Sequence, residues 1–423
     1  MAITEIRIMS MSVQHPPRFV FNAQKNTWRG RKTAWGLGLL LGCKPAPSDE
    51  LLDRVALSYH QSDELGDRVA AELFQNPSLR TAGLNPHQLL KTGVEQGAAA
   101  VGELTPQLKA MLTMAETTPH WVDEAQLETG CGLIHRWGRF AMYALGDFSL
   151  LGGYANSDIA KPLAFTGALN GNSSFDRVSE TTSFWFDVTT PGGLKPGHAG
   201  FNSAVKVRVM HALVRARLLQ HPDWNSDEWG LPINQGDAVA TNVAFSMMMI
   251  TGLAMLGWRF RDDEIEAVLH LWRYVAYLMG DDYTLLPQTR QEGVDWLYII
   301  ALGSRVNPDA DSLELARSYL DNFLQVPGSR AYQWYVYWFH RMYANWFIPA
   351  DIRKALNIPR APLLSLLPLL QFPVIRLLDW GAHRFPAIDR WLQRIGRRGQ
   401  AYIVSSRLQG RAVTFTDKQT LAR

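Results

Sequence analysis

The stretch "SAVKVRVMHALVRARLL", residues 203–219, repeats apolar residues at intervals of three and four, which is the spacing of an amphipathic helix. His211 stands in its middle, and Val207 and Val214 fall on the same side of the predicted helix. A histidine on such a face is commonly a core residue whose ring bonds to a carbonyl or a carboxylate. It can also be a ligand whose imidazole faces a bound group. The helix alone leaves both interpretations open.

Two arginines flank His211, about one turn away in each direction. They are Arg208 and Arg215, and both are close enough along the helix to share a ligand with the imidazole. Guanidinium groups bind carboxylates through paired hydrogen bonds, for example the propionates of haem. The flanking arginines therefore favour a ligand site slightly over a packed core histidine.

The rest of the chain has mainly helical patterns. Residues 48–74, "SDELLDRVALSYHQSDELGDRVAAELF", alternate apolar and charged residues at helical spacing. A capping signal at Asp263 predicts a helix that stops at Gly280. Residues 330–347 are aromatic enough for a strand, but their length predicts a buried helix. Alternating strand patterns are scarce, so the sequence predicts an all-α fold.

Composition narrows the function classes. The chain has 423 residues, 47% of them hydrophobic, with 15 tryptophans and a net charge of only +3. Such a small charge predicts no nucleic-acid partner. Two cysteines, Cys43 and Cys131, provide neither a disulfide framework nor a zinc cluster, and the absence of a CxxCH motif excludes covalently attached haem.

The organisation along the chain predicts one large domain with two extensions. Residues 1–47 form an N-terminal extension, residues 48–350 a single helical domain, and residues 351–423 a C-terminal apolar and basic arm. Within the arm, an apolar segment broken by prolines precedes an arginine-rich helix, a pattern typical of membrane interfaces. We therefore expect peripheral membrane contact through residues 361–398, with packing on the domain as the alternative.

The N-terminal extension contains a segment that resembles a lipoprotein signal. Residues 29–43 begin with basic residues, continue with a short apolar stretch and end at Cys43. The apolar stretch is short and far from the start, so we expect a short buried or surface-lying helix there. No run reaches the roughly 18–20 unbroken apolar residues of a membrane span. The prediction is a cytoplasmic protein with peripheral membrane association, favoured over export through Cys43.

Two further stretches bear on a binding site. In residues 153–186 the second half reads as a helix with Arg177, Glu180 and Thr181 on one stripe. The simple alternative is a partly exposed helix in which Arg177 and Glu180 form a weak ion pair. Residues 231–264 are almost entirely apolar or small and rich in methionine between Asp237 and Leu256, which is typical of adaptable core or of a cavity wall.

Common catalytic motifs are absent. The sequence has no GxGxxG after a strand, no Walker A lysine loop, no GxSxG elbow and no HExxH. Its eleven histidines include no pair at metal-chelating spacing on one predicted helix. Dinucleotide, P-loop, serine-hydrolase and zinc-protease chemistry are therefore not expected.

The order of several motifs resembles a known family. The series "YAN…KPLAFTG…RVSETTSFW…KVRVMHALVR…LPINQGDAVATNVAFS…GWR…LHLWRYVAYLMG" is similar to the rubber oxygenase (latex clearing protein) and MpaB-type oxygenase family over roughly residues 120–290. The separation of Arg177 and His211 also agrees with that family's arginine-to-histidine spacing. The order of these motifs carries the resemblance, since no one of them is decisive.

The resemblance implies a globin-like helical core with one non-covalent haem b. The family's proximal iron ligand falls on His211, and its arginine and threonine near the other side of the haem fall on Arg177 and Thr181. Rubber-cleaving members use dioxygen to cleave carbon–carbon double bonds of isoprenoid chains. An apolar, methionine-lined cavity would suit both haem and such a substrate.

Two positions depart from the family pattern. Glu180 stands where rubber oxygenases have a lysine, and an ungapped count places Lys161 where they have a glutamate thought to act as a base. One hypothesis is that Lys161 and Glu180 form the same ion pair with reversed polarity and belong to the catalytic site.

Because of these two departures, the predicted substrate class is broader than rubber: a hydrophobic, isoprenoid or lipid-like molecule. We therefore expect a haem b-dependent oxygenase with His211 as iron ligand, and with Arg177, Thr181, Arg208 and Arg215 near the haem. Glu180 would serve as a proton shuttle. The alternatives are a haem-binding sensor or carrier without turnover, and a helical, membrane-associated lipid-binding protein without haem.

Overall fold

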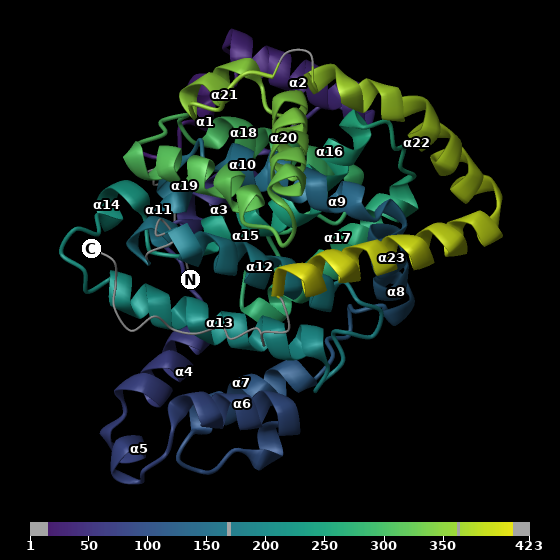
Figure 1. The fold of residues 1–423 in the computed structure, drawn as a ribbon. Helices are drawn as coiled ribbons and strands as arrows, with labels where there is room; N and C mark the ends of the chain where they lie inside the picture. Colours follow the sequence, from purple (N-terminus) through teal and green to yellow (C-terminus); the bar gives the residue numbers. More distant parts are fainter. Residues whose placement is uncertain (1–15, 167–170, 362–363, 409–423) are drawn as a thin grey trace, which may run out of the picture.

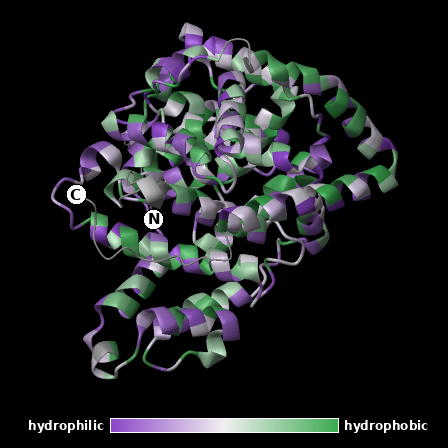
Figure 2. Cartoon of the chain, in the orientation of Figure 1, coloured by the Kyte–Doolittle hydropathy of each residue, from purple (hydrophilic) through white to green (hydrophobic). Residues whose placement is uncertain are grey.

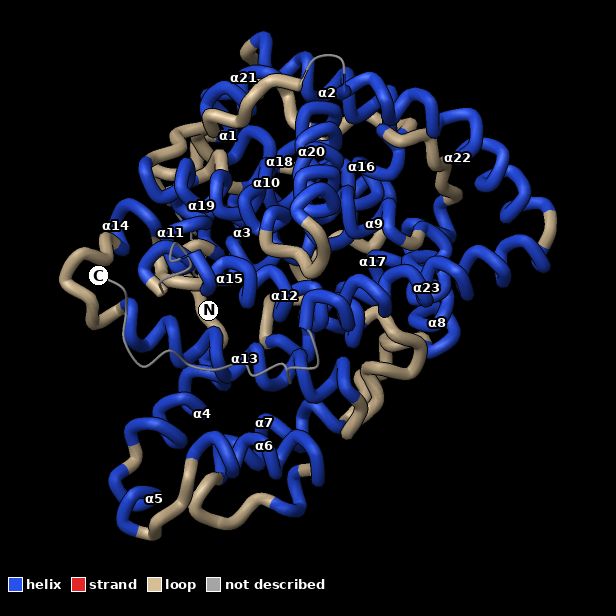
Figure 3. The backbone as a smooth tube through the Cα atoms, in the orientation of Figure 1, coloured by secondary structure: helices blue, strands red, loops and turns tan. Residues whose placement is uncertain are grey.

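The protein folds as an assembly of helices. The computed structural model describes residues 16–166, 171–361 and 364–408, and no strand occurs within those ranges (Figure 3). The predicted all-α fold is therefore confirmed.

The elements follow one another along the chain with short connections (Figure 1). Those labelled α are α-helices, η2 and η3 are π-helical segments, and the other η elements are 3₁₀ turns. In chain order they are α1 (Phe21–Gln24), α2 (Trp28–Leu41), α3 (Asp49–Ser58), α4 (Glu64–Gln75), α5 (Pro77–Thr81), α6 (Pro86–Gln96), η1 (Ala98–Ala100), α7 (Pro106–Glu116), α8 (Glu124–Trp137), α9 (Arg139–Tyr143), η2 (Ala144–Leu150), α10 (Leu151–Gly153), α11 (Ser157–Phe165), α12 (Gly171–Val188), α13 (Ala199–Leu218), α14 (Ser226–Trp229), α15 (Gln235–Val243), η3 (Ala244–Met248), α16 (Met249–Met255), α17 (Asp262–Met279), α18 (Arg290–Gly303), α19 (Ala310–Asp321), η4 (Asn322–Leu324), α20 (Arg330–Phe347), α21 (Ala350–Ala355), η5 (Leu364–Leu366), α22 (Leu367–Arg384) and α23 (Pro386–Leu408).

Local signals in the sequence explain where several helices begin and end. Helix α17 stops at Gly280, whose φ of 78° is the left-handed conformation that glycine adopts easily, as predicted. The turn after it is stabilised by Asp282, whose carboxylate accepts hydrogen bonds from Thr284. Helix α20 covers the predicted residues 330–347, but its first half is largely exposed, and only its second half is buried in the core.

Helix α13, which contains His211, lies between two parts of the molecule. A small lobe of α4, α6 and α7 packs on one side of it, and α12 and α17 of the main body pack on the other (Figure 1). The 20 residues of α13 contact both parts, so different stripes of this helix meet different environments. Residues near His211 can therefore face either the small lobe or the main body.

The methionine-rich stretch forms the central helix of the main body. Helices α15 and α16 run as one helix interrupted by the π-helical segment η3, and together they span Gln235–Met255. By length and composition this is the one helix among the described residues that could cross a membrane, yet 61% of its apolar window is buried inside the protein. It is better explained as the core helix of a globular fold.

The terminal segments pack on the domain. Helix α2 contacts α16 and α18, and α23 contacts α8 and α12. Helix α22 differs, because it lies on the outside and presents a strongly apolar surface (Figure 2). The terminal helices are thus part of the folded body, and α22 is its most apolar exposed element.

Candidate functional site

A large cavity of about 1720 Å³ lies inside the main body. Its wall is mainly apolar, and among the side chains that line it are Leu145, Phe148, Phe245, Met248, Met255 and Val336. Ligand pockets commonly occupy about 300–1,000 Å³. The cavity therefore has room for more than one small molecule, and the methionine-rich helix contributes to its wall as predicted.

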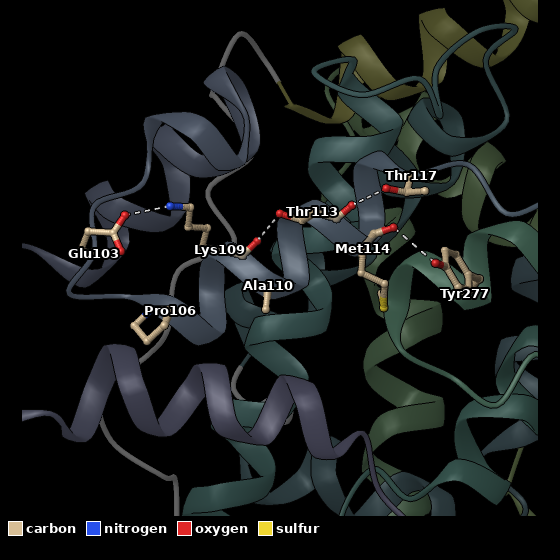
Figure 4. A pocket seen from close by; sticks show the side chains of 8 residues that line it. All are labelled: Glu103, Pro106, Lys109, Ala110, Thr113, Met114, Thr117 and Tyr277. Atoms are coloured by element: carbon tan, nitrogen blue, oxygen red, sulfur yellow. Dashed lines mark hydrogen bonds and ion pairs between the residues drawn. The ribbon is translucent and has the colours of Figure 1, made fainter.

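A second, smaller pocket of about 700 Å³ opens at the surface beside α7 (Figure 4). Its polar side chains are already bonded within the protein. Lys109 pairs with Glu103 at 2.9 Å, and the Tyr277 hydroxyl donates to the carbonyl of Met114 at 3.3 Å. Since the polar groups of this pocket bond to one another, they are not available to a ligand. The large cavity is therefore the candidate functional site.

His211 lines the large cavity from α13. The side chain is half-buried in this wall. Burial lowers the pKa of the imidazole to about 4, and the positive charge of Arg215 adds to this effect while Asp63 opposes it. Neither ring nitrogen hydrogen bonds to any of the described residues. His211 is therefore a neutral imidazole with nitrogen atoms available to a ligand.

The residues around His211 divide into two stripes of α13. Val207, Met210 and Val214 line the cavity with His211. Arg208 and Arg215 lie on the adjoining side, toward α4, and do not belong to the cavity wall described by the structure. His211 thus stands at the edge of the cavity-facing stripe.

Helix α12 brings three predicted residues to the same cavity. Arg177, Glu180 and Thr181 all line it, as their shared stripe predicts. Arg177 donates one hydrogen bond, 3.0 Å long, to the carbonyl of Thr166. Burial lowers the pKa of this guanidinium, and the charge of Glu180 partly offsets that effect. The structure therefore brings His211 and the α12 residues together around one space.

Comparison with known families decides the classification. Residues 134–372, more than half of the chain, match the family described as ER-bound oxygenase mpaB/B'/Rubber oxygenase, catalytic domain. The chain belongs to this oxygenase family. The matched range contains α12, α13 and α20 and ends before α23, so the C-terminal helix lies outside the region the family defines.

Two individual proteins agree with this family. The rubber oxygenase of Streptomyces sp. (strain K30) is 27% identical over 206 residues, which are 48% of this chain and 49% of that protein. The chain thus aligns with about half the length of this relative. The solved structure of latex clearing protein LCP in the closed state superposes with a TM-score of 0.64, covering 81% of this chain and 91% of that one. At 20% identity this likeness shows a shared helical fold.

Arg208 and Arg215, predicted to lie near the cofactor, point away from the cavity in this structure. Arg208 forms two hydrogen bonds of 2.7 Å with Asp63, and Arg215 bonds to Asp67 at 2.8 Å and to the carbonyl of Ile233. Both side chains are almost fully buried. The helical spacing that places them near His211 turns them toward the small lobe, where carboxylates satisfy them.

The predicted ion pair of Lys161 with Glu180 does not form. The Lys161 ammonium pairs instead with Asp309 and with Asp311, the latter at 3.3 Å, and it lies 5.2 Å from the centre of the Trp229 ring. The neighbours of Lys161 on α11 line the cavity, but Lys161 faces the other side of that helix. Lys161 therefore holds α11 to α19 on the side of α11 away from the cavity, and its catalytic role stays a prediction.

Sequence reasoning missed a second histidine of the cavity wall. His340, on α20, lines the cavity and bonds through Nδ1 to both carboxylate oxygens of Asp147, each at 2.9 Å. The two residues are far apart along the chain, so no local spacing connects them. Asp147 lies on the π-helical segment η2, and such segments often occur at functional sites.

Proposed function

We propose that this protein is a haem b-dependent oxygenase that uses dioxygen to oxidise a hydrophobic, isoprenoid-like substrate in the large cavity. The observation that carries the proposal is the arrangement of His211, Arg177, Glu180 and Thr181 around one apolar space within an oxygenase-family domain. The names of the related rubber oxygenase and latex clearing protein support a polyisoprene-like substrate.

The residues of the cavity fit haem as the cofactor. His211 is neutral, as an axial ligand must be before it binds iron, and neither of its ring nitrogens has a hydrogen-bond partner among the described residues. No group of three or more potential metal-binding side chains occurs in the described parts of the chain. A single histidine can hold iron firmly only if a macrocycle supplies the other ligands, and this favours haem over a metal ion bound by the protein alone.

The α12 residues would orient the reactants. The guanidinium of Arg177 uses one of its nitrogen atoms for the bond to Thr166, and its remaining donors can hydrogen bond a haem propionate or dioxygen. The Thr181 hydroxyl would face the same space, and the Glu180 carboxyl could carry a proton to or from it. Haem would supply the one-electron chemistry that dioxygen needs to react with a carbon–carbon double bond.

An absorption spectrum tests the cofactor. After reconstitution with haem, the protein should show a Soret band, and His211→Ala should abolish it. His198→Ala is the matched control, because His198 is exposed at the start of the same helix. A His211→Ala protein that retains stoichiometric haem would contradict the assignment. A wild-type protein without the band would instead support a lipid-binding protein without haem.

Oxygen consumption tests turnover. The haem-loaded protein should consume dioxygen in the presence of polyisoprene, prenylated quinones or unsaturated lipids, and it should give carbonyl products. Stable haem binding with no substrate-dependent oxygen uptake would contradict the oxygenase proposal and support a haem sensor or carrier.

We also propose that α22 rests on a membrane surface. Its exposed side chains include Leu370, Leu377 and Trp380, which are 72%, 65% and 59% accessible, and arginines follow on α23. An apolar helix next to cationic residues is typical of the lipid interface. Sedimentation with anionic vesicles should carry the protein down, and Leu370→Glu with Leu377→Glu should release it. Equal sedimentation of the double variant would contradict this placement.

A further inference from the structure

The wall of the large cavity contains a polar cluster outside the α12 and α13 residues. Asp147 on η2 is fully buried and accepts a hydrogen bond of 2.8 Å from the hydroxyl of Tyr319 on α19. The same carboxylate bonds to Nδ1 of His340 at 2.9 Å. Three elements that are distant in sequence thus converge on one buried carboxylate.

This geometry fixes the orientation of the His340 ring. A carboxylate bonded to Nδ1 holds the proton on that nitrogen, so Nε2 is left to accept or share a proton. The ring stacks on Phe323 with centroids 3.5 Å apart and planes 7° from parallel. Nε2 has no hydrogen-bond partner among the described residues, and His340 lines the cavity. The ring therefore presents a preorganised polar atom to a ligand.

A half-buried cation lies beside the same phenylalanine. Arg407, near the end of α23, lines the cavity, and its guanidinium lies 5.4 Å from the centre of the Phe323 ring. Its Nη1 atom is buried without a hydrogen-bond partner, and no ion pair of Arg407 occurs within the described ranges. Burial lowers the pKa of this guanidinium, an effect that the nearby Tyr319 and Asp147 oppose.

A guanidinium nitrogen that is buried without a hydrogen-bond partner, as Nη1 of Arg407 is, costs free energy because it has lost its hydration. The cost falls if a ligand brings acceptor oxygens into the cavity. A carboxyl group has a suitable partner for each side chain, because one oxygen would accept from Arg407 while the other would share one proton with Nε2 of His340. An alcohol can satisfy only one of them well, and a hydrocarbon neither.

We propose that His340 and Arg407 bind the carboxyl group of a long-chain apolar acid whose tail occupies the apolar part of the cavity. The inference rests on the proposed function in taking this cavity as the substrate site. It narrows the proposed hydrophobic, isoprenoid-like substrate to one that also carries an acidic head group.

Binding of three ligands with the same tail tests the inference. We would measure displacement of the fluorescent fatty acid cis-parinaric acid from the full-length protein by oleic acid, oleyl alcohol and 9-octadecene. Oleic acid should bind at least about tenfold more tightly than the alcohol, because charge-assisted hydrogen bonds are the stronger ones. Equal affinities for the acid and the hydrocarbon would overturn the proposal.

Two variants localise the effect. Arg407→Leu should weaken oleic acid binding about tenfold or more while leaving oleyl alcohol nearly unchanged. Arg398→Leu, an exposed change on the same helix, is the matched control and should bind like the wild type. His340→Gln gives a second test if Arg407→Leu does not fold, and it should reduce the preference for the acid. A folded Arg407→Leu or His340→Gln protein with wild-type preference would overturn the proposal.

Failure of this inference can be distinguished from failure of the proposed function. The Soret band and oxygen uptake are recorded on the same samples, and Arg407→Leu should keep its haem. Selective acid binding without a Soret band would support the carboxyl site and contradict the haem oxygenase. A Soret band with substrate-dependent oxygen uptake but no preference for the acid would support the haem oxygenase and contradict the carboxyl site.

Discussion

The two histidines of the large cavity differ in the hydrogen-bond partners of their rings. His211 has no hydrogen-bond partner among the described residues and lies next to valines and a methionine. His340 is held by the Asp147 carboxylate and stacked on Phe323. His211 offers a nitrogen to a wall of apolar side chains, whereas the Asp147 carboxylate keeps the proton of His340 on Nδ1 and leaves its Nε2 for hydrogen bonding. Under the two proposals, the cavity would hold the cofactor at His211 and a polar head group at His340.

The negative charge of Asp63 opposes the lowering of the His211 pKa, and this carboxylate forms an ion pair with Arg208. Arg208→Met would leave Asp63 buried without its partner. Because removal of one member of a buried ion pair leaves an uncompensated charge, the free energy of unfolding should fall by about 3–5 kcal/mol. Urea unfolding followed by circular dichroism measures this loss. Lys206→Met is the comparison, because it removes only a more exposed ion pair with Glu95 on the same helix. Equally small losses in both variants would contradict the importance of the Arg208–Asp63 pair.

Removing the carboxylate behind His340 should make the two histidines more alike. Asp147→Asn keeps the shape but weakens the bonds to His340 and to Tyr319. The free energy of unfolding should fall by about 1–3 kcal/mol, since charge-assisted hydrogen bonds are replaced by neutral ones. Preference for oleic acid should fall with it, while the Soret band should stay. Loss of haem in this variant would contradict the separation of the two sites.

A third histidine, His383 on α22, is also bonded to a carboxylate, but it lies outside the cavity and contributes to stability. Its Nε2 bonds to Glu264 at 3.0 Å, and this bond raises the pKa of His383 above its usual 6.5. The stabilisation is therefore complete below pH 6.5 and lost as the pH rises through the raised value. Burial raises the pKa of Glu264, but bonds from His383 and the charge of Arg136 outweigh this and lower it to about 2.

The stabilisation from Glu264 is complete above pH 4.5 and is lost as the pH falls toward 2. The difference in melting temperature between wild type and His383→Gln should therefore be largest between about pH 4.5 and 6.5 and should shrink above that window. It should be the smallest of these effects, because His383 is partly exposed. A difference that grows toward pH 9 would contradict the assigned pair.

The sequence predicted those features that depend on local spacing. The all-α fold, the end of α17 at Gly280 and the placing of Arg177, Glu180 and Thr181 on one stripe follow from helical periodicity and capping. The resemblance of ordered motifs identified the family and pointed to His211.

Features that depend on tertiary partners could not be predicted. Arg208 and Lys161 each find carboxylates on elements distant in sequence, and no spacing rule indicates which partner a long cation will reach. The same holds for His340 and Asp147, whose relation exists only after η2 and α20 pack together. The π-helical segments were missed because their extra residue has no clear signal in periodicity.

Haem loading of the two histidine variants tests the central comparison most directly. Wild type, His211→Ala and His340→Ala would be titrated with haem and followed by the Soret absorbance under the same conditions. We predict that His211→Ala loses the band while His340→Ala binds haem like the wild type. Loss of the band in His340→Ala with retention in His211→Ala would contradict the account.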